Sequence, residues 1–161
     1  MTVARYPVII TTMASQALPT AAEILNRFYA AETTYMSAPP SERDFAGGMG
    51  QHLSQELTLL QSPDLPYSKS LYKGHAGFQQ WSEEMAGLFD SLVVHEPKVF
   101  ERDGDDEVVV SSTLKLGTRE GGRKWEAPMV QIMRVDREKG VIVMIQPIYW
   151  DVAGLNGVVG R

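Results

Sequence analysis

The chain has 161 residues, of which 43% are hydrophobic and 22% charged, a composition typical of one globular domain with a single substantial core. Its net charge of −5 and its scattered basic residues argue against a nucleic-acid-binding surface, so no nucleic acid is expected as a partner. The absence of cysteine excludes disulfides, thiolate metal sites and a thiol nucleophile, and it suits a cytoplasmic location.

Residues 1–18 are expected to form a flexible or loosely docked N-terminal arm, because polar residues interrupt their short apolar patch. Residues 19–161 are expected to form a single domain. No run approaches the roughly 18 to 20 apolar residues that a transmembrane helix requires, so no membrane is expected as a partner.

The first predicted helix begins after Thr20, which with Glu23 forms the signature of a capping box. Apolar residues then recur at helical spacing along one side until the chain reaches Pro39 and Pro40, which end the helix. This apolar stripe comprises Ala21, Ile24, Leu25, Phe28, Ala31 and Tyr35.

The middle of the chain is less regular. Glycines in the segment 47–56 predict at most a short second helix, residues 57–61 a brief strand, and two prolines in the segment 62–67 an irregular loop. A longer helix with an aromatic face is predicted after Gly74. Ordinary core packing is the simplest reading of that face, which contains Phe78, Trp81, Ser82, Met85, Leu88, Phe89 and Leu92.

From Val93 onward the hydrophobic period changes to two, and turn-forming residues at 103–106, 120–123 and 136–140 predict four successive antiparallel strands. In two of these strands one set of alternating residues is expected to face inward. The inward sets are Val108, Val110, Ser112, Leu114 and Leu116 in one strand, and Trp125, Ala127, Met129, Gln131 and Met133 in the next.

The last strand, 141–151, is apolar on both faces. Its odd-numbered residues Ile145, Pro147, Tyr149 and Asp151 are expected to face inward. Its even-numbered residues Ile142, Met144, Ile148 and Trp150 then need another cover, and we expect a second copy of the chain to provide it in a homodimer.

Together with the element order, the segment GHAGFQQWSEEM (74–85) and the strand ending PIYWD (147–151) resemble the nuclear transport factor 2-like superfamily and its SnoaL-like branch. The resemblance covers about residues 20–155. It implies an α+β fold of the cystatin/nuclear transport factor 2-like type, in which a curved antiparallel sheet wraps around N-terminal helices to form a cone with a hydrophobic pocket. Members include polyketide cyclases, ketosteroid isomerases, dehydratases and binding modules without chemistry.

The resemblance also points to particular residues. The catalytic base of ketosteroid isomerases falls near Gln61 and their oxyanion-stabilising acid near Gln131, so both positions hold neutral amides in this chain. These amides are suited to orienting a carbonyl or hydroxyl ligand rather than to the isomerase mechanism in its familiar form.

The candidate catalytic residues are Asp151 and His75. Asp151 could exchange a proton if an apolar pocket favoured its neutral form, or it could simply cap the turn that follows the last strand or pair with Arg43. His75, at the start of the second long helix, could act as a neutral base or be an ordinary helix residue. The candidate substrate-binding residues are Gln61, Gln131, Tyr149, Trp81, Met129 and Tyr72.

These residues favour a SnoaL-like enzyme that uses acid–base chemistry to cyclise, isomerise or dehydrate a hydrophobic metabolite containing a carbonyl group, with neither cofactor nor metal. The alternatives are a module that binds a small hydrophobic ligand without converting it, and a dimeric interaction module whose cone is filled by its own side chains.

Overall fold

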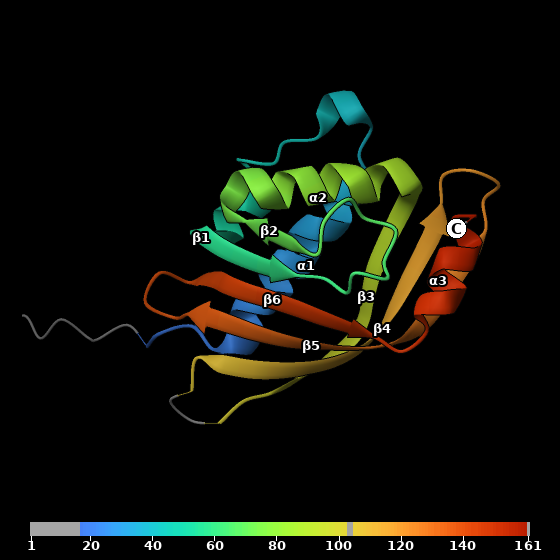
Figure 1. Cartoon of the computed structure of the whole chain (residues 1–161). Helices are drawn as coiled ribbons and strands as arrows, with labels where there is room; N and C mark the ends of the chain where they lie inside the picture. The colour runs from blue at the N-terminus through green and yellow to red at the C-terminus, as the bar shows by residue number, and fades with distance from the viewer. Residues whose placement is uncertain (1–16, 103–104, 161) are drawn as a thin grey trace, which may run out of the picture.

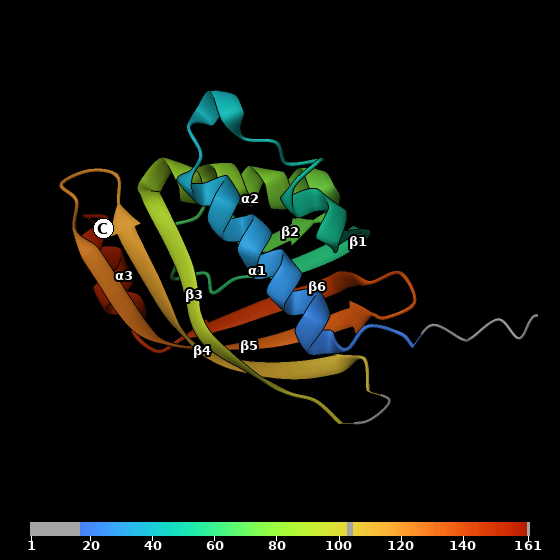
Figure 2. The ribbon, with the colours of Figure 1, turned by 180° about the vertical axis from the view of Figure 1, so that it is seen from behind.

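The computed structural model describes residues 17–102 and 105–160, which form a curved six-stranded sheet with helices α1 and α2 on one side of it (Figures 1 and 2). Of the expected N-terminal arm, residues 1–16 lie outside the described residues. The helices are α1 (Ala21–Ser37), α2 (Gly74–Leu88) and α3 (Val152–Val158), with short 3₁₀ turns at Pro40–Glu42 and Met49–His52. The strands are β1 (Leu53–Leu60), β2 (Leu71–Lys73), β3 (Phe89–Phe100), β4 (Glu107–Thr118), β5 (Lys124–Asp136) and β6 (Val141–Tyr149).

Helix α1 begins as its sequence predicts. The Thr20 hydroxyl accepts a hydrogen bond from the Glu23 backbone N–H at 3.2 Å, and the Glu23 carboxylate accepts one from the Thr20 backbone N–H at 2.8 Å. The helix ends at Ser37, before the two prolines. Its apolar stripe packs into the core. Figure 2 shows α1 lying across the concave side of the sheet.

The strand order is β2-β1-β6-β5-β4-β3. The four consecutive strands β3 to β6 pair antiparallel, as predicted, and the two expected inward sets of β4 and β5 are all buried. The sheet is nevertheless mixed, because β1 runs parallel to its neighbour β6. The α+β class and the curved sheet around N-terminal helices are therefore confirmed, with one parallel pair added to the antiparallel sheet.

The predicted alternation of the last strand is wrong at Ile142 and at Asp151, which lies beyond the end of β6. Ile142 was expected to face outward, but it is fully buried. The cause is a shift in the pairing of β5 with β6, where Arg134 lies opposite Met144 and the next residue, Val135, lies opposite Ile142. Such an irregularity reverses the side on which the following residues point, which no period-two pattern can anticipate.

Among the described residues, no helix combines the length and the apolar character needed to cross a membrane.

Candidate functional site

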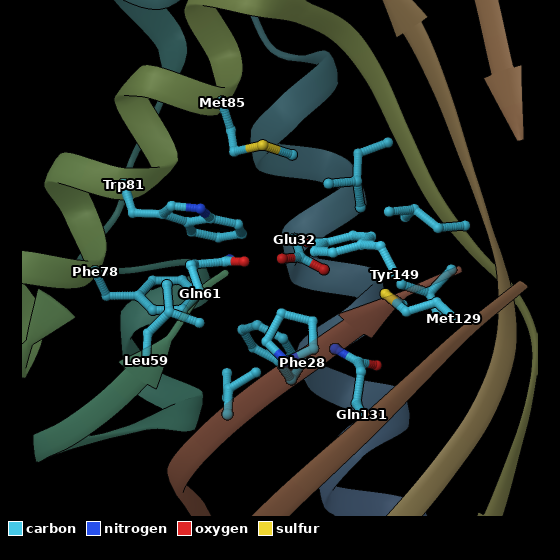
Figure 3. A pocket seen from close by; sticks show the side chains of 15 residues that line it. Phe28, Glu32, Leu59, Gln61, Phe78, Trp81, Met85, Met129, Gln131 and Tyr149 are labelled. Atoms are coloured by element: carbon cyan, nitrogen blue, oxygen red, sulfur yellow. The ribbon is translucent and has the colours of Figure 1, made fainter. Parts of the chain in front are cut away.

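A hollow lies between α1, α2 and the concave side of the sheet, with about 370 Å³ of empty space among the side chains that line it (Figure 3). The space is divided into narrow crevices, so it admits water-sized molecules as it stands, and a larger ligand requires side chains to move. Most of the wall is apolar, and its polar side chains come from five different parts of the fold. These are Glu32 on α1, Gln61 just after β1, Trp81 on α2, Gln131 on β5 and Tyr149 on β6.

Glu32 is the only ionisable carboxyl among the residues that line the hollow. It is 6% exposed, its carboxyl points into the hollow, and no hydrogen-bond partner for it is found within residues 17–102 and 105–160 (Figure 3). Within the described part of the chain, no lysine, arginine or histidine lines the hollow to balance a negative charge. Burial disfavours the ionised form and raises the pKa of Glu32 to about 8. Glu32 can therefore both hold and release a proton near neutral pH.

Gln131 presents a hydrogen-bond donor to the same space. The Tyr29 hydroxyl donates to Gln131 Oε1 at 2.7 Å, which fixes the amide so that its nitrogen faces the hollow (Figure 3). Burial raises the pKa of Tyr29, so its hydroxyl stays protonated and remains a donor. The hollow thus has a proton-exchanging acid on α1 and a fixed N–H donor on β5.

Gln61 contributes polar atoms that no protein group satisfies. Both its amide nitrogen and its amide oxygen are buried without a hydrogen-bond partner in the described chain. Burial raises the pKa of Tyr149, and the nearby Gln61 amide and Tyr67 hydroxyl influence that pKa without reaching hydrogen-bond geometry. The Tyr67 hydroxyl and the Trp81 indole N–H are likewise buried and unpaired. Unsatisfied buried polar atoms are uncommon in folded proteins, and bound water or a ligand is their usual partner.

Five of the residues proposed from the sequence to bind substrate line the hollow together, although the roles themselves stay predictions. They are Gln61, Gln131, Tyr149, Trp81 and Met129.

The sixth, Tyr72, lies on β2 outside the hollow, where its hydroxyl donates to Glu84 at 3.0 Å. His75 also lies outside it. The imidazole Nε2 contacts the Leu53 carbonyl oxygen at 2.9 Å, and the ring packs edge-on against Phe45. His75 was proposed because it lies at the start of a helix, but its contacts with Leu53 and Phe45 place the ring outside the hollow.

The expectation that Asp151 faces the pocket is wrong. Its side chain is exposed, and it caps α3 by accepting a hydrogen bond from the Gly154 backbone N–H at 2.8 Å. Strand β6 ends at Tyr149, so the inward alternation does not continue to Asp151. The turn-capping alternative is the one that the structure supports.

The carboxyl in the hollow is instead Glu32, which the sequence reasoning missed. It lies four residues after Phe28 and three before Tyr35, so it falls within the apolar stripe of the first helix. A charged residue inside an apolar stripe is the same kind of signal that singled out Gln131 in its strand. No group of three or more histidine, aspartate or glutamate side chains that could hold a metal occurs in the described part of the chain.

Solved structures with the same architecture identify the fold. A nuclear transport factor 2-like protein of unknown function from Burkholderia pseudomallei K96243 is 16% identical, with a TM-score of 0.68 over 87% of this chain and 97% of that one. The chain has the nuclear transport factor 2-like fold. TerC, co-crystallised with polyporic acid, shares this fold at 17% identity and a TM-score of 0.68, over 87% of this chain and 98% of its own.

A third similar structure is that of a hypothetical protein with a ketosteroid isomerase-like fold from Catenulispora acidiphila DSM 44928, determined in complex with trimethylamine. It is 18% identical, with a TM-score of 0.63 over 86% of this chain and 95% of its own. Other matches carry provisional names as polyketide cyclases. No protein-family model matches the sequence. No curated protein matches it either. At these identities the similarity establishes the fold and leaves the chemistry to be argued from the hollow.

Proposed function

We propose that the chain is a small-molecule enzyme that carries out acid–base chemistry without a cofactor, such as cyclisation, isomerisation or dehydration, on a largely apolar metabolite with a carbonyl group. The observation that carries the proposal is Glu32, a buried and unpaired carboxyl whose pKa of about 8 lies near neutral pH. Proton transfer is most efficient when the catalytic group has a pKa near the operating pH.

The arrangement suits removal of a proton from a carbon next to a carbonyl group. About a tenth of the Glu32 side chains are ionised at pH 7, given a pKa of about 8, and the ionised form takes the proton. Negative charge then develops on the carbonyl oxygen, where the Gln131 N–H can donate a hydrogen bond. The protonated Glu32 afterwards returns the proton to a different atom, which completes an isomerisation or assists ring closure or loss of water.

The structural relatives support ligand binding within this fold. TerC was crystallised with polyporic acid, and other relatives are provisionally named polyketide cyclases. The apolar wall of the hollow, interrupted by a few polar side chains, has the composition of a small-molecule site.

A non-catalytic binding module of the same fold is the second candidate. It is favoured by the neutral amides of Gln61 and Gln131, which can orient a ligand but cannot transfer a proton. The two functions differ in what Glu32 does to a bound ketone.

Exchange of ketone α-protons for deuterium distinguishes them without knowledge of the natural substrate. The protein is incubated with 2-pentanone in D₂O, and proton NMR follows loss of the α-proton signal. We expect exchange above background in the wild type and a loss of about 10²-fold or more in Glu32→Gln. Glu83→Gln, an equivalent change at an exposed site of α2, is the control and should exchange as the wild type does.

Equal exchange by wild type and Glu32→Gln would remove Glu32 from the chemistry. Binding of 2-pentanone without any exchange by the wild type would favour the binding module.

A further inference from the structure

A groove on the outer side of the sheet adjoins the hollow and shares three of its lining residues, Gln61, Pro147 and Tyr149. The groove encloses about 690 Å³ of space open to solvent. Its remaining wall, as far as the described residues form it, carries no charged side chain and consists of Leu60, Ser62, Pro63, Gln146, Ile148 and Val152. The three shared side chains therefore form a partition between an inner and an outer space.

The backbone pairing of β1 with β6 stops before this partition. The pairing of the parallel strands β1 and β6 ends where Leu59 lies opposite Ile145. Beyond that point the Gln61 backbone N–H donates to the Ser70 carbonyl oxygen at 2.8 Å, away from β6, and Pro147 has no N–H to offer. No ladder hydrogen bond among the described residues closes the sheet here, so side chains alone separate the two spaces.

The partition is also weakly held. Both amide atoms of Gln61 lack hydrogen-bond partners in the described structure, so moving this side chain breaks no hydrogen bond. Its contact with the Tyr149 hydroxyl falls short of hydrogen-bond geometry. Displacing the two side chains requires a loss of packing only, and a polar atom of a ligand that passes between them can satisfy the Gln61 amide.

The size of the hollow makes the groove necessary for all but the smallest ligands. Sites for molecules of ordinary metabolite size measure roughly 300 to 1,000 Å³. The hollow reaches the lower limit only when its crevices are counted together. The groove by itself lies well within that range.

We propose that the groove is the outer subsite for the same ligand, which is an elongated, uncharged molecule. Its carbonyl end lies beside Glu32 and Gln131, and its apolar tail passes between Gln61 and Tyr149 to lie against Val152. This inference rests on the proposed function for the position of the carbonyl group, and it adds the length and the neutral character of the remainder.

A series of 2-alkanones from 2-pentanone to 2-undecanone tests the groove. Their dissociation constants are measured by calorimetry, with circular dichroism to verify that each variant is folded. In the wild type we expect affinity to increase by about fourfold for each added methylene that reaches the groove. Val152→Glu places a charge in the groove and should abolish this increase for long ketones while leaving 2-pentanone binding unchanged.

Two further variants make the comparison specific. Ser62→Glu places the same charge at another residue that lines the groove and should reproduce the effect if Val152→Glu fails to fold. Ala153→Glu, on the exposed side of α3 outside the groove, should behave as the wild type.

Affinity that stops increasing at short chain lengths in the wild type would overturn the inference, as would an increase that survives both groove variants. If a second copy of the chain fills the groove, affinity should likewise stop increasing at short chain lengths. The proposed function is judged separately by 2-pentanone exchange, which needs the hollow alone. If no ketone of any length binds, the ligand class is wrong and the outer subsite falls with it.

Discussion

Replacing Glu32 should make the protein more stable, by an amount that depends on pH. In the folded protein the carboxyl keeps its proton up to about pH 8, whereas an unfolded chain releases it near the ordinary value of 4.5. The folded state therefore binds more protons between these values, and the free energy of unfolding falls as pH rises through this interval. Each pH unit in the interval lowers it by ~1.4 kcal/mol, which amounts to about 3 kcal/mol at pH 7 and about 5 kcal/mol above pH 8.

Glu32→Gln keeps the shape of the side chain but cannot ionise, so it should escape this loss. Urea unfolding of wild type, Glu32→Gln and the exposed control Glu83→Gln is measured from pH 5 to pH 9. We expect the advantage of Glu32→Gln over wild type to grow by about 3 to 5 kcal/mol across that range, while Glu83→Gln follows the wild type. A difference between Glu32→Gln and wild type that is the same at pH 5 and pH 9 would refute the burial argument.

Three further results are expected. Tyr29→Phe removes the donor to Gln131 Oε1 and should lower the free energy of unfolding by about 1 to 3 kcal/mol. In a double-mutant cycle, adding Gln131→Leu to Tyr29→Phe should restore much of that free energy. Additive effects of the two substitutions would contradict the pairing. Asp151→Ala removes the cap of α3 and should lower the free energy of unfolding in urea by about 1 kcal/mol without slowing ketone exchange. Slower exchange would show that Asp151 takes part in the proton transfer. Val109 and Val130 lie partly exposed on the outer face of the sheet, on the neighbouring strands β4 and β5, and we propose that this face forms a homodimer. Sedimentation equilibrium at micromolar concentration should find a dimer for wild type and a monomer for Val130→Glu. A monomeric wild type would contradict this proposal.

Much of the fold could be predicted because its signals are local. The capping box of Thr20 and Glu23 and the period-two patterns of β4 and β5 depend only on neighbouring residues, and the structure confirms them. The burial of Ile142 could not be predicted, since it depends on how β6 is paired with β5. The parallel pairing of β1 with β6 is a long-range choice of the same kind.

The site residues could also be predicted where the signal was local and not where it depended on long-range contacts. Gln131 was found because a polar residue on an inward strand face is a local anomaly, and it does line the hollow. Glu32 was an equal anomaly within the apolar stripe of α1 and could have been found by the same rule. Asp151 was misplaced because the alternation was extended past the true end of β6, where the chain turns into α3. The Tyr29 hydrogen bond to Gln131 joins residues 102 positions apart, and nothing in the sequence indicates it.

The most direct test of a proton-exchanging acid in the hollow is the titration of the Glu32 carboxyl carbon by ¹³C NMR, with the signal assigned by its absence in Glu32→Gln. The burial of this unpaired carboxyl predicts a midpoint near pH 8. A midpoint close to the ordinary value of 4.5 would show that the charged form is well solvated, and it would contradict both the closed, apolar hollow and the chemistry proposed for it.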